Sequence, residues 1–209
     1  EILKSLNDAR THRTPIGVST HLQAWDRRLV GPNDAPLRFT KDKSGMDDSS
    51  FTLIQNPPLR LIVVGAVHIA QALLPMAHIA GYAPFLIDPR DSFGSQTRFP
   101  NETILNEWPD VAVESLGLDA RTALVTLTHD PKLDTPALAA ALNSDAFYIG
   151  ALGSSRTHAK RRAQLIDLGF TDSQIDRIHG PVGSNIGAAT PSEIAISIMA
   201  QITEVLRAP

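Results

Sequence analysis

In the second part of the chain, short apolar runs typical of strands alternate with segments whose apolar residues have helical spacing. Residues 59–64 and 84–87 are short apolar runs with the composition of buried strands, and residues 68–80 between them place apolar side chains at helical spacing. Gly65 follows the first run, and Gly81 follows the helical segment. The pattern predicts a strand-helix-strand unit, which is the first half of a Rossmann-like fold.

The same alternation continues to the end of the chain. Further strands are predicted at residues 102–108, 123–127 and 146–149, and further helices at residues 111–116, 134–142 and from Ser154 or Ser155 to Gly169. Ala159, Ala163 and Ile166 are expected on the inner face of the last of these helices. Thr190 begins a capping box with proline at the first helical position, which predicts a closing helix. We therefore expect a three-layer α/β fold, Rossmann-like, with a mostly parallel sheet.

Residues 1–56 differ from the rest in composition. Strands are predicted at residues 15–21 and 26–30, and residues 31–50 contain the prolines, glycines and charges that are typical of a loop or linker. We expect residues 1–56 to form a small N-terminal appendage and linker, and residues 57–209 to form the Rossmann-like domain.

The turn after the first core strand meets the dinucleotide-binding fingerprint G-x-G-x-x-G/A only in part. Gly65 and Ala70 fit, but Val67 occupies the position where a second glycine lets the backbone approach a pyrophosphate. Asp88 lies 23 residues after Gly65, at the distance of the acidic residue that meets a ribose hydroxyl. In the competing interpretation, Gly65 only makes the turn and Asp88 only ends a strand.

Several predicted strands run directly into polar or small residues. An open parallel sheet binds ligands beyond the carboxyl ends of its strands, so these residues should gather around one crevice. They are Gly65, Ala66, His68, Asp88, Arg90, Thr128, His129, Asp130, Gly153, Ser154, Ser155, Arg156 and His158. The histidines have suitable donor atoms for a metal but no close ligand spacing, so we predict no metal site.

Basic residues occupy an unusual place in the helix that begins near Ser155. Arg156 and Lys160 lie in or just past its first turn, where the helix dipole disfavours a cation by about 0.3–1 kcal/mol. An anion bound at the start of this helix would reverse that effect, because amide N–H groups and basic side chains would converge on it. The alternative is a solvated basic face.

Composition narrows the range of functions. The 209 residues are 43% hydrophobic, enough for a full core, and their formal net charge of −3 gives no overall support for a nucleic-acid or anionic-membrane partner. The chain has no cysteine, which excludes disulfides, thiolate metal ligands and a sulfur-relay cysteine within it. Nothing resembles a secretory signal or a membrane span, so we expect a cytoplasmic protein.

A set of short motifs occurs in one order along the chain: Pro57-Pro58-Leu59-Arg60-Leu61, Asp88-Pro89-Arg90, Arg98-Phe99-Pro100, Thr128-His129-Asp130, Tyr148 to Ser154 with Arg156, and Gly180-Pro181-Val182-Gly183 with Ile186-Gly187-Ala188. Through these motifs, residues 51–206 resemble the C-terminal domain of the xanthine dehydrogenase accessory protein family (XdhC/CoxI). Val67 and Ser184 differ from the glycine and leucine usual in the family. The glycine-rich motifs of the family's N-terminal domain are not recognisable in residues 1–50.

The resemblance implies a factor that matures a molybdenum hydroxylase by binding molybdenum cofactor and assisting its sulfuration or insertion. It implies a hydroxylase apoenzyme and a cysteine desulfurase as partners, and a homodimer. On this interpretation Arg90, Ser154 and Arg156 grip the cofactor phosphate, while His129 and Asp130 orient its polar head and no residue is catalytic. Two other functions stay open: an NAD(P)-dependent oxidoreductase, and a non-catalytic scaffold for partner proteins.

Overall fold

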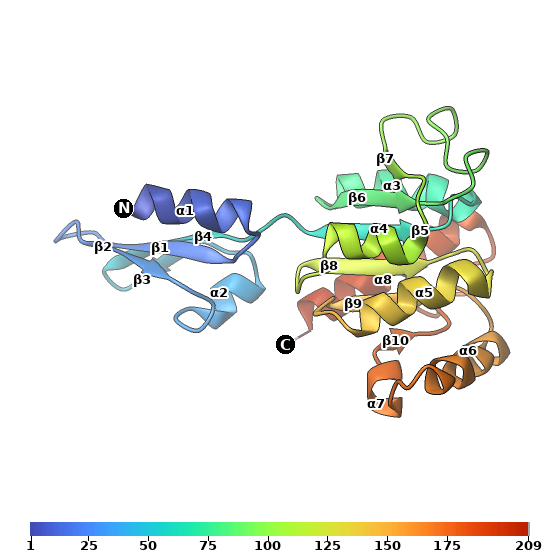
Figure 1. The fold of residues 1–209 in the computed structure, drawn as a ribbon. Helices are drawn as coiled ribbons and strands as arrows, with labels where there is room; N and C mark the ends of the chain where they lie inside the picture. Colours follow the sequence, from blue (N-terminus) through green and yellow to red (C-terminus); the bar gives the residue numbers. More distant parts are fainter. Residues whose placement is uncertain (209) are drawn as a thin grey trace. The chain divides into compact units, whose positions relative to one another are not determined.

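The computed structural model describes residues 1–208, which fold into two compact units. The first comprises Glu1–Pro57 and the second begins at Pro58. The α/β architecture that the hydrophobic pattern predicts is confirmed in the second unit, where helices cover both sides of a parallel sheet (Figure 1). Within the described part of the chain, no helix has the length and apolar character needed to cross a membrane.

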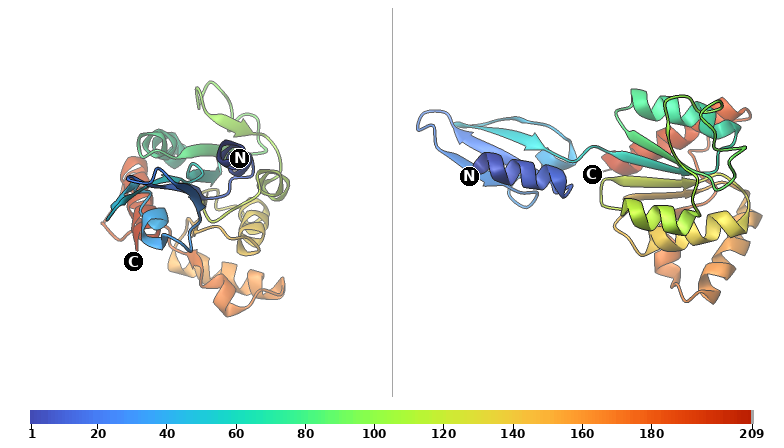
Figure 2. Two further views of the ribbon diagram at one scale, coloured as in Figure 1. Left: turned by 90° about the vertical axis from the view of Figure 1, so that its left-hand side faces the viewer. Right: turned by 45° about the horizontal axis from the view of Figure 1, so that its top comes forward.

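The N-terminal unit is a four-stranded antiparallel sheet with two helices. Its strands lie in the order β2-β1-β4-β3, and α1 lies along one face of the sheet (Figure 2). The element bounds are α1 Ile2–Thr11, β1 Ile16–His21, β2 Arg27–Val30, α2 Pro36–Thr40, β3 Gly45–Asp47 and β4 Ser50–Gln55. The strands predicted at residues 15–21 and 26–30 are confirmed, whereas the loop predicted for residues 31–50 is wrong.

One arginine links two short elements of that region. Arg38 in α2 forms an ion pair with Asp47 in β3, with its Nη2 2.6 Å from a carboxylate oxygen, and it also donates to the Met46 carbonyl at 2.7 Å. These contacts stabilise a helix of five residues and a strand of three. Local composition carries no sign of them, which is why the polar sequence looked like a linker.

The second unit contains a six-stranded sheet in which every neighbouring pair is parallel. The strand order is β10-β9-β8-β5-β6-β7, so the first strand of the unit, β5, lies beside β8 and β6. This is the doubly wound order of dinucleotide-binding folds, with its switch point between β5 and β8. The bounds are β5 Arg60–Val64, β6 Ala83–Ile87, β7 Thr103–Leu105, β8 Thr122–Thr126, β9 Tyr148–Ala151 and β10 Ile178–His179.

Helices form a layer on each face of this sheet. α3 (His68–Ile79) and α8 (Pro191–Arg207) pack on one face, in a core with Leu61, Val63 and Val125. α4 (Pro109–Leu116), α5 (Pro131–Leu142), α6 (Ser155–Asp167) and α7 (Asp172–Ile175) cover the other face. The capping box at Thr190 is confirmed, because its hydroxyl accepts from the Glu193 amide.

The inner face predicted for the helix after Ser154 is wrong. Ala159, Ala163 and Ile166 are exposed, and the buried residues of α6 are Arg161 and Leu165. An apolar-spacing argument excludes arginine from a core, but Arg161 is only 6% exposed because it faces the carboxylate of Asp134 in α5. α6 therefore faces the core with Arg161 and Leu165, and not with the alanines that the apolar spacing suggested.

A buried arginine joins the amino ends of the central strands. Arg60, at the start of β5, donates to the Thr122 hydroxyl at 2.9 and 3.1 Å and to the carbonyls of Leu116 and Gly117 at the end of α4. These contacts lie at the edge opposite to the carboxyl ends of the strands. Arg60 therefore stabilises the fold and takes no part in the predicted crevice.

Candidate functional site

The floor of the crevice is the contact between the ends of β5 and β8. Gly65 follows β5 with a φ of 112°, and a Cβ built on it would lie 2.6 Å from Cγ2 of Thr128. The chain turns from β5 toward α3 on one face of the sheet, and from β8 toward α5 on the other. This divergence opens the crevice, and glycine is required at its base.

Asp88, at the end of β6, is fully buried and accepts hydrogen bonds from two sides. One carboxylate oxygen accepts from the Ala66 amide at 2.8 Å and from Arg90 Nη2 at 2.7 Å. The other accepts from the Arg90 amide at 3.0 Å and from Arg90 Nε at 2.8 Å. Asp88 therefore stabilises the turn after β5. Recognition of a ribose would need an exposed carboxylate, and this one is buried.

Burial raises the pKa of Asp88, but the hydrogen bonds from the Arg90 side chain and from the amides of Ala66 and Arg90 outweigh it. The net pKa lies below the ordinary value of an aspartate, so this carboxylate is ionised at neutral pH. Arg90 keeps a partly exposed guanidinium stacked over Phe93, with its Cζ 4.0 Å from the ring centroid. Its role in anion binding stays a prediction, although two of its nitrogens already bind Asp88.

The loop after Asp88 folds back onto the same turn. Arg98 Nη1 donates to the Ala66 carbonyl at 2.9 Å and to the Phe93 carbonyl at 2.8 Å. Asn106, after β7, donates to the carbonyls of Asp88 and Gly94. Both the amide and the carbonyl of Ala66 are thus hydrogen-bonded to side chains of the segment that follows β6. This segment therefore stabilises the turn between β5 and α3.

The segment after β8 presents one exposed histidine between two anchored residues. The Thr128 hydroxyl donates to Asp134 at 2.7 Å and accepts from the Asp130 amide at 3.0 Å. Asp130 caps α5 by accepting from the Lys132 amide at 2.9 Å. His129 has a φ of 61° and is exposed at the crevice edge.

The segment after β9 supplies a helix start with exposed cations. Gly153 has a φ of 143°, and Ser154 caps α6 by accepting from the Thr157 amide at 3.2 Å, as predicted. The amides of Ser155 and Arg156 lie in the first turn and have no intrahelical acceptor. Arg156 is exposed, and it forms no ion pair with any residue the structure describes.

The predicted histidines do not form a metal site among the residues described here. No three histidine or acidic side chains within residues 1–208 lie close enough together to hold an ion. His68 is exposed in the first turn of α3, while His158 is partly buried against the backbone of Gly180. Burial, together with Arg161 and Arg162, lowers the pKa of His158, so it is neutral at pH 7.

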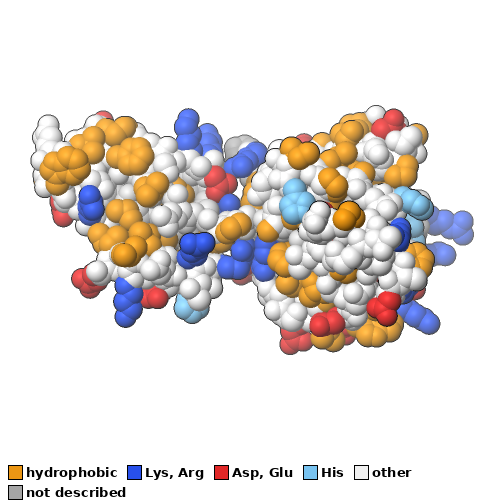
Figure 3. Space-filling model, turned by 90° about the horizontal axis from the view of Figure 1, so that it is seen from above, with side chains coloured by type: hydrophobic (Ala, Val, Ile, Leu, Met, Phe, Trp, Pro, Cys, Tyr) orange, Lys and Arg blue, Asp and Glu red, His pale blue; other side chains and the backbone are white. Residues whose placement is uncertain are grey.

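Basic and histidine side chains gather at the carboxyl edge of the sheet. Figure 3 shows Lys, Arg and His side chains at the right-hand side of the Rossmann unit, the side toward which its strands point in Figure 1. Exposed His68, His129, Arg156 and Lys160 belong to segments that begin at this edge. The edge therefore suits an anionic ligand with hydrogen-bonding groups.

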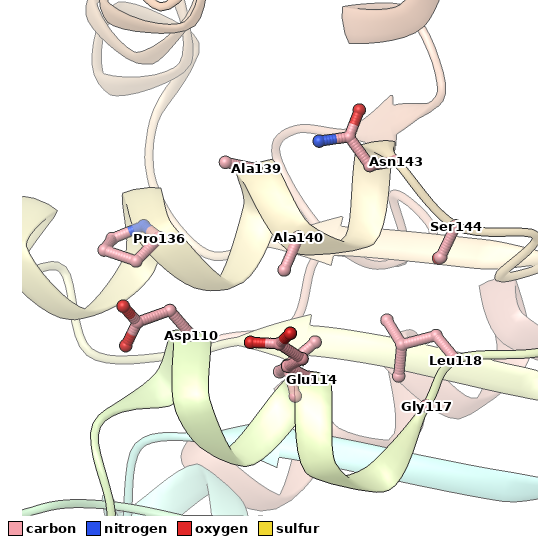
Figure 4. A pocket seen from close by; sticks show the side chains of 10 residues that line it. Asp110, Glu114, Gly117, Leu118, Pro136, Ala139, Ala140, Asn143 and Ser144 are labelled. Carbon is pink, nitrogen blue, oxygen red and sulfur yellow. The ribbon is translucent and has the colours of Figure 1, made fainter.

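A separate groove runs between α4 and α5. Asp110 and Glu114 of α4 lie opposite Pro136 and Ala140 of α5 (Figure 4), and Gly117 and Leu118 continue the groove. None of the predicted site residues lines it. None of the described residues that line the groove is positively charged, and we do not include the groove in the candidate site.

Asp134 and Arg161 are residues that the sequence interpretation missed. They form a buried ion pair, with Arg161 Nη2 3.7 Å from Asp134 Oδ2, directly behind the segments after β8 and β9. The available signal is weak: Asp134 follows the strand-end residue Asp130 by one helical turn, and Arg161 follows Leu152 by nine residues.

Comparisons with known proteins agree with this architecture. The XdhC Rossmann domain family matches residues 61–202. The chain is 31% identical over 166 residues to "Molybdenum cofactor insertion chaperone PaoD" of Escherichia coli (strain K12), covering 79% of this chain and 46% of that protein. It is 28% identical over 180 residues to a protein of Bacillus subtilis (strain 168) described as a probable xanthine dehydrogenase component, covering 82% and 52%.

A solved structure shares the fold. A crystal structure described as a xanthine dehydrogenase from Bacillus halodurans superposes with a TM-score of 0.72 at 24% identity, covering 99% of this chain and 64% of that one. The chain spans about half the length of the two curated relatives named above.

Proposed function

Since the chain belongs to the XdhC family, we propose that it helps to mature a molybdenum hydroxylase by binding molybdenum cofactor at the carboxyl edge of its sheet. The family match carries this proposal, and the similarity to a relative named as a molybdenum cofactor insertion chaperone supports it. The proposed partner is a hydroxylase apoenzyme. The same proposal includes a cysteine desulfurase as a second partner, sulfuration of the cofactor, and a homodimer.

The residues at this edge suit an anionic, heterocyclic cargo. The first-turn amides of α6 and the exposed guanidinium of Arg156 provide donors for a phosphate. His129 and Asp130 offer hydrogen-bonding groups beside them for the polar head of the pterin. The cargo itself supplies the redox-active molybdenum centre, and this chain's task would be to hold and release it.

Arg156→Ala is expected to weaken cofactor binding by about 10–100-fold, since it removes a charge-assisted hydrogen bond of about 1.5–3 kcal/mol. The chain would be expressed in a host that makes molybdenum cofactor, and the retained pterin-sized adduct followed by native mass spectrometry and cofactor titration. Arg162→Ala is the matched control, because Arg162 lies in the same helix but pairs with Asp172 and Asp176. Equal binding by the two variants would exclude Arg156 from the site.

The strand order favours a second candidate, an oxidoreductase that binds NAD(P). In that case Val67→Gly should tighten NAD(H) and NADP(H) binding, because it restores the second glycine of the fingerprint. We expect no gain in affinity. The Ala66 amide already donates to Asp88, and both Asp88 oxygens already accept from Arg90, so these groups are not free to bind a dinucleotide. Isothermal titration of the parent and of Val67→Gly measures this; tight dinucleotide binding would redirect the search to a hydride-transfer substrate. A crevice that takes neither ligand would favour the scaffold.

A further inference from the structure

The buried pair of Asp134 and Arg161 contacts both segments that form the proposed cofactor site. Asp134 Oδ1 accepts from the Thr128 hydroxyl at 2.7 Å, and that hydroxyl accepts from the Asp130 amide at 3.0 Å. On the other side, Arg161 Nη2 donates to the Leu152 carbonyl at 3.0 Å, next to Gly153. The pair therefore joins the segment after β8 to the segment after β9 through side chains of α5 and α6.

The stability of the fold does not by itself explain this buried ion pair. Asp134 and Arg161 are 2% and 6% exposed, and among the described residues Asp134 Oδ2 and Arg161 Nη1 are buried without a hydrogen-bond partner. Burial raises the pKa of Asp134 despite the Thr128 hydroxyl and the Arg161 charge, and burial lowers the pKa of Arg161. Apolar side chains of similar volume commonly stabilise a core as well as such a pair does.

What apolar side chains would not provide is the connection between the two segments. On one side the pair reaches Thr128, which precedes the left-handed backbone position of His129, and on the other side it reaches Leu152, which precedes the helix start at Ser154. Thr126, at the end of β8 between these segments, also has a buried hydroxyl without a partner in the described part of the chain. The region is thus polar and incompletely bonded. The Leu152 amide donates to the Thr126 carbonyl at 2.9 Å across the ends of β8 and β9, and beyond that backbone bond the pair links the two segments through side chains.

We infer that Asp134 and Arg161 are positioning residues, which set the spacing between the segment carrying His129 and Asp130 and the segment carrying Ser154 and Arg156. The inference rests on the proposed function for its ligand, but the connection between the segments is a property of the chain alone. A cofactor held by both segments would bind through a preformed spacing, so neither Asp134 nor Arg161 needs to touch it.

The test replaces the pair by apolar residues, Asp134→Leu with Arg161→Met, in the full chain. We expect this double variant to unfold near the urea midpoint of the parent, because no charge is left buried alone. Hydrogen–deuterium exchange should nevertheless be faster in peptides covering residues 127–131 and 151–155. Titration with molybdenum cofactor released from a hydroxylase should show binding weakened by about tenfold or more.

Arg162→Met is the control, since it removes a partly buried arginine of the same helix that pairs with Asp172 and Asp176, away from both peptides, and should leave their exchange unchanged. If the double variant fails to fold, Thr128→Val breaks the link on the β8 side while the charges stay paired, and exchange should rise there. Parent-like exchange in both peptides would overturn the inference, even if the parent binds cofactor. If exchange is faster in the double variant but the parent binds no cofactor, the inference would be supported and the proposed function contradicted.

Discussion

Asp88→Ala is expected to lower the free energy of unfolding by about 3–5 kcal/mol, a large part of the stability of a domain of this size. The substitution leaves the buried amide of Ala66 and the partly buried amide of Arg90 without their acceptor, at about 1–3 kcal/mol each. The Arg90 guanidinium is partly exposed, so it can turn to solvent and adds little to the loss. Urea denaturation followed by circular dichroism measures the change.

The pH dependence of stability identifies the charge of Asp88 as the cause. Its pKa is lowered in the folded state, so its contribution is full above the unfolded-state pKa of about 3.9 and is lost as pH falls through the folded-state value. The stability difference between the parent and Asp88→Asn should therefore be largest above about pH 5 and shrink below about pH 4. Exposed Asp145→Asn should change stability by less than about 0.5 kcal/mol. A difference for Asp88→Asn that is constant with pH would contradict this account.

Gly65→Ala should cost about 4 kcal/mol of unfolding free energy, as the sum of two effects. A φ of 112° is strained for any residue with a Cβ, at about 1–3 kcal/mol, and overpacking adds a similar amount. The overpacking arises because the new methyl group would lie 2.6 Å from Thr128 Cγ2 and 3.2 Å from the Thr128 amide nitrogen. Thermal and urea unfolding of the purified variant would show the loss.

A second glycine separates these two effects. Gly169 has a φ of 93°, but no other group lies within 4 Å of the place where a Cβ would stand, so Gly169→Ala should cost only the backbone strain of about 1–2 kcal/mol. Thr128→Ser removes Cγ2 and keeps the hydroxyl, so it should recover about 1 kcal/mol when combined with Gly65→Ala. Equal costs at the two glycines would show that the contact at the crevice floor is unimportant.

The central strands could be predicted because parallel strands buried on both faces are continuous apolar runs. Residues 59–64 and 123–127 were placed correctly on that basis. The strand predicted at residues 102–108 is confirmed only as the short β7, and the one predicted at residues 146–149 begins later, at Tyr148. α1, α7 and β10 were missed, since two are very short and α1 is mostly polar.

At the candidate site, the sequence predicted which residues reach the strand ends but not what they contact there. Asp88 and Arg90 were assigned to a ligand, and the structure pairs them with each other. Their spacing of two residues after a strand is compatible with such a pair, but no local pattern requires it. Asp134 and Arg161 are 27 residues apart and become neighbours only when α5 and α6 pack, so linear spacing carries only a weak signal for them.

Both sheets end in short strands, and this limits how the protein could aggregate. The outer strands of the parallel sheet contain three residues in β7 and two in β10, while the outer strand β2 of the N-terminal sheet carries Arg27 and Arg28. Such edges offer a second chain few free backbone groups to pair with. The most aggregation-prone runs, β5 and β8, are buried along their whole length. Fibril formation should therefore require unfolding of the Rossmann unit and not growth from an edge of the native protein.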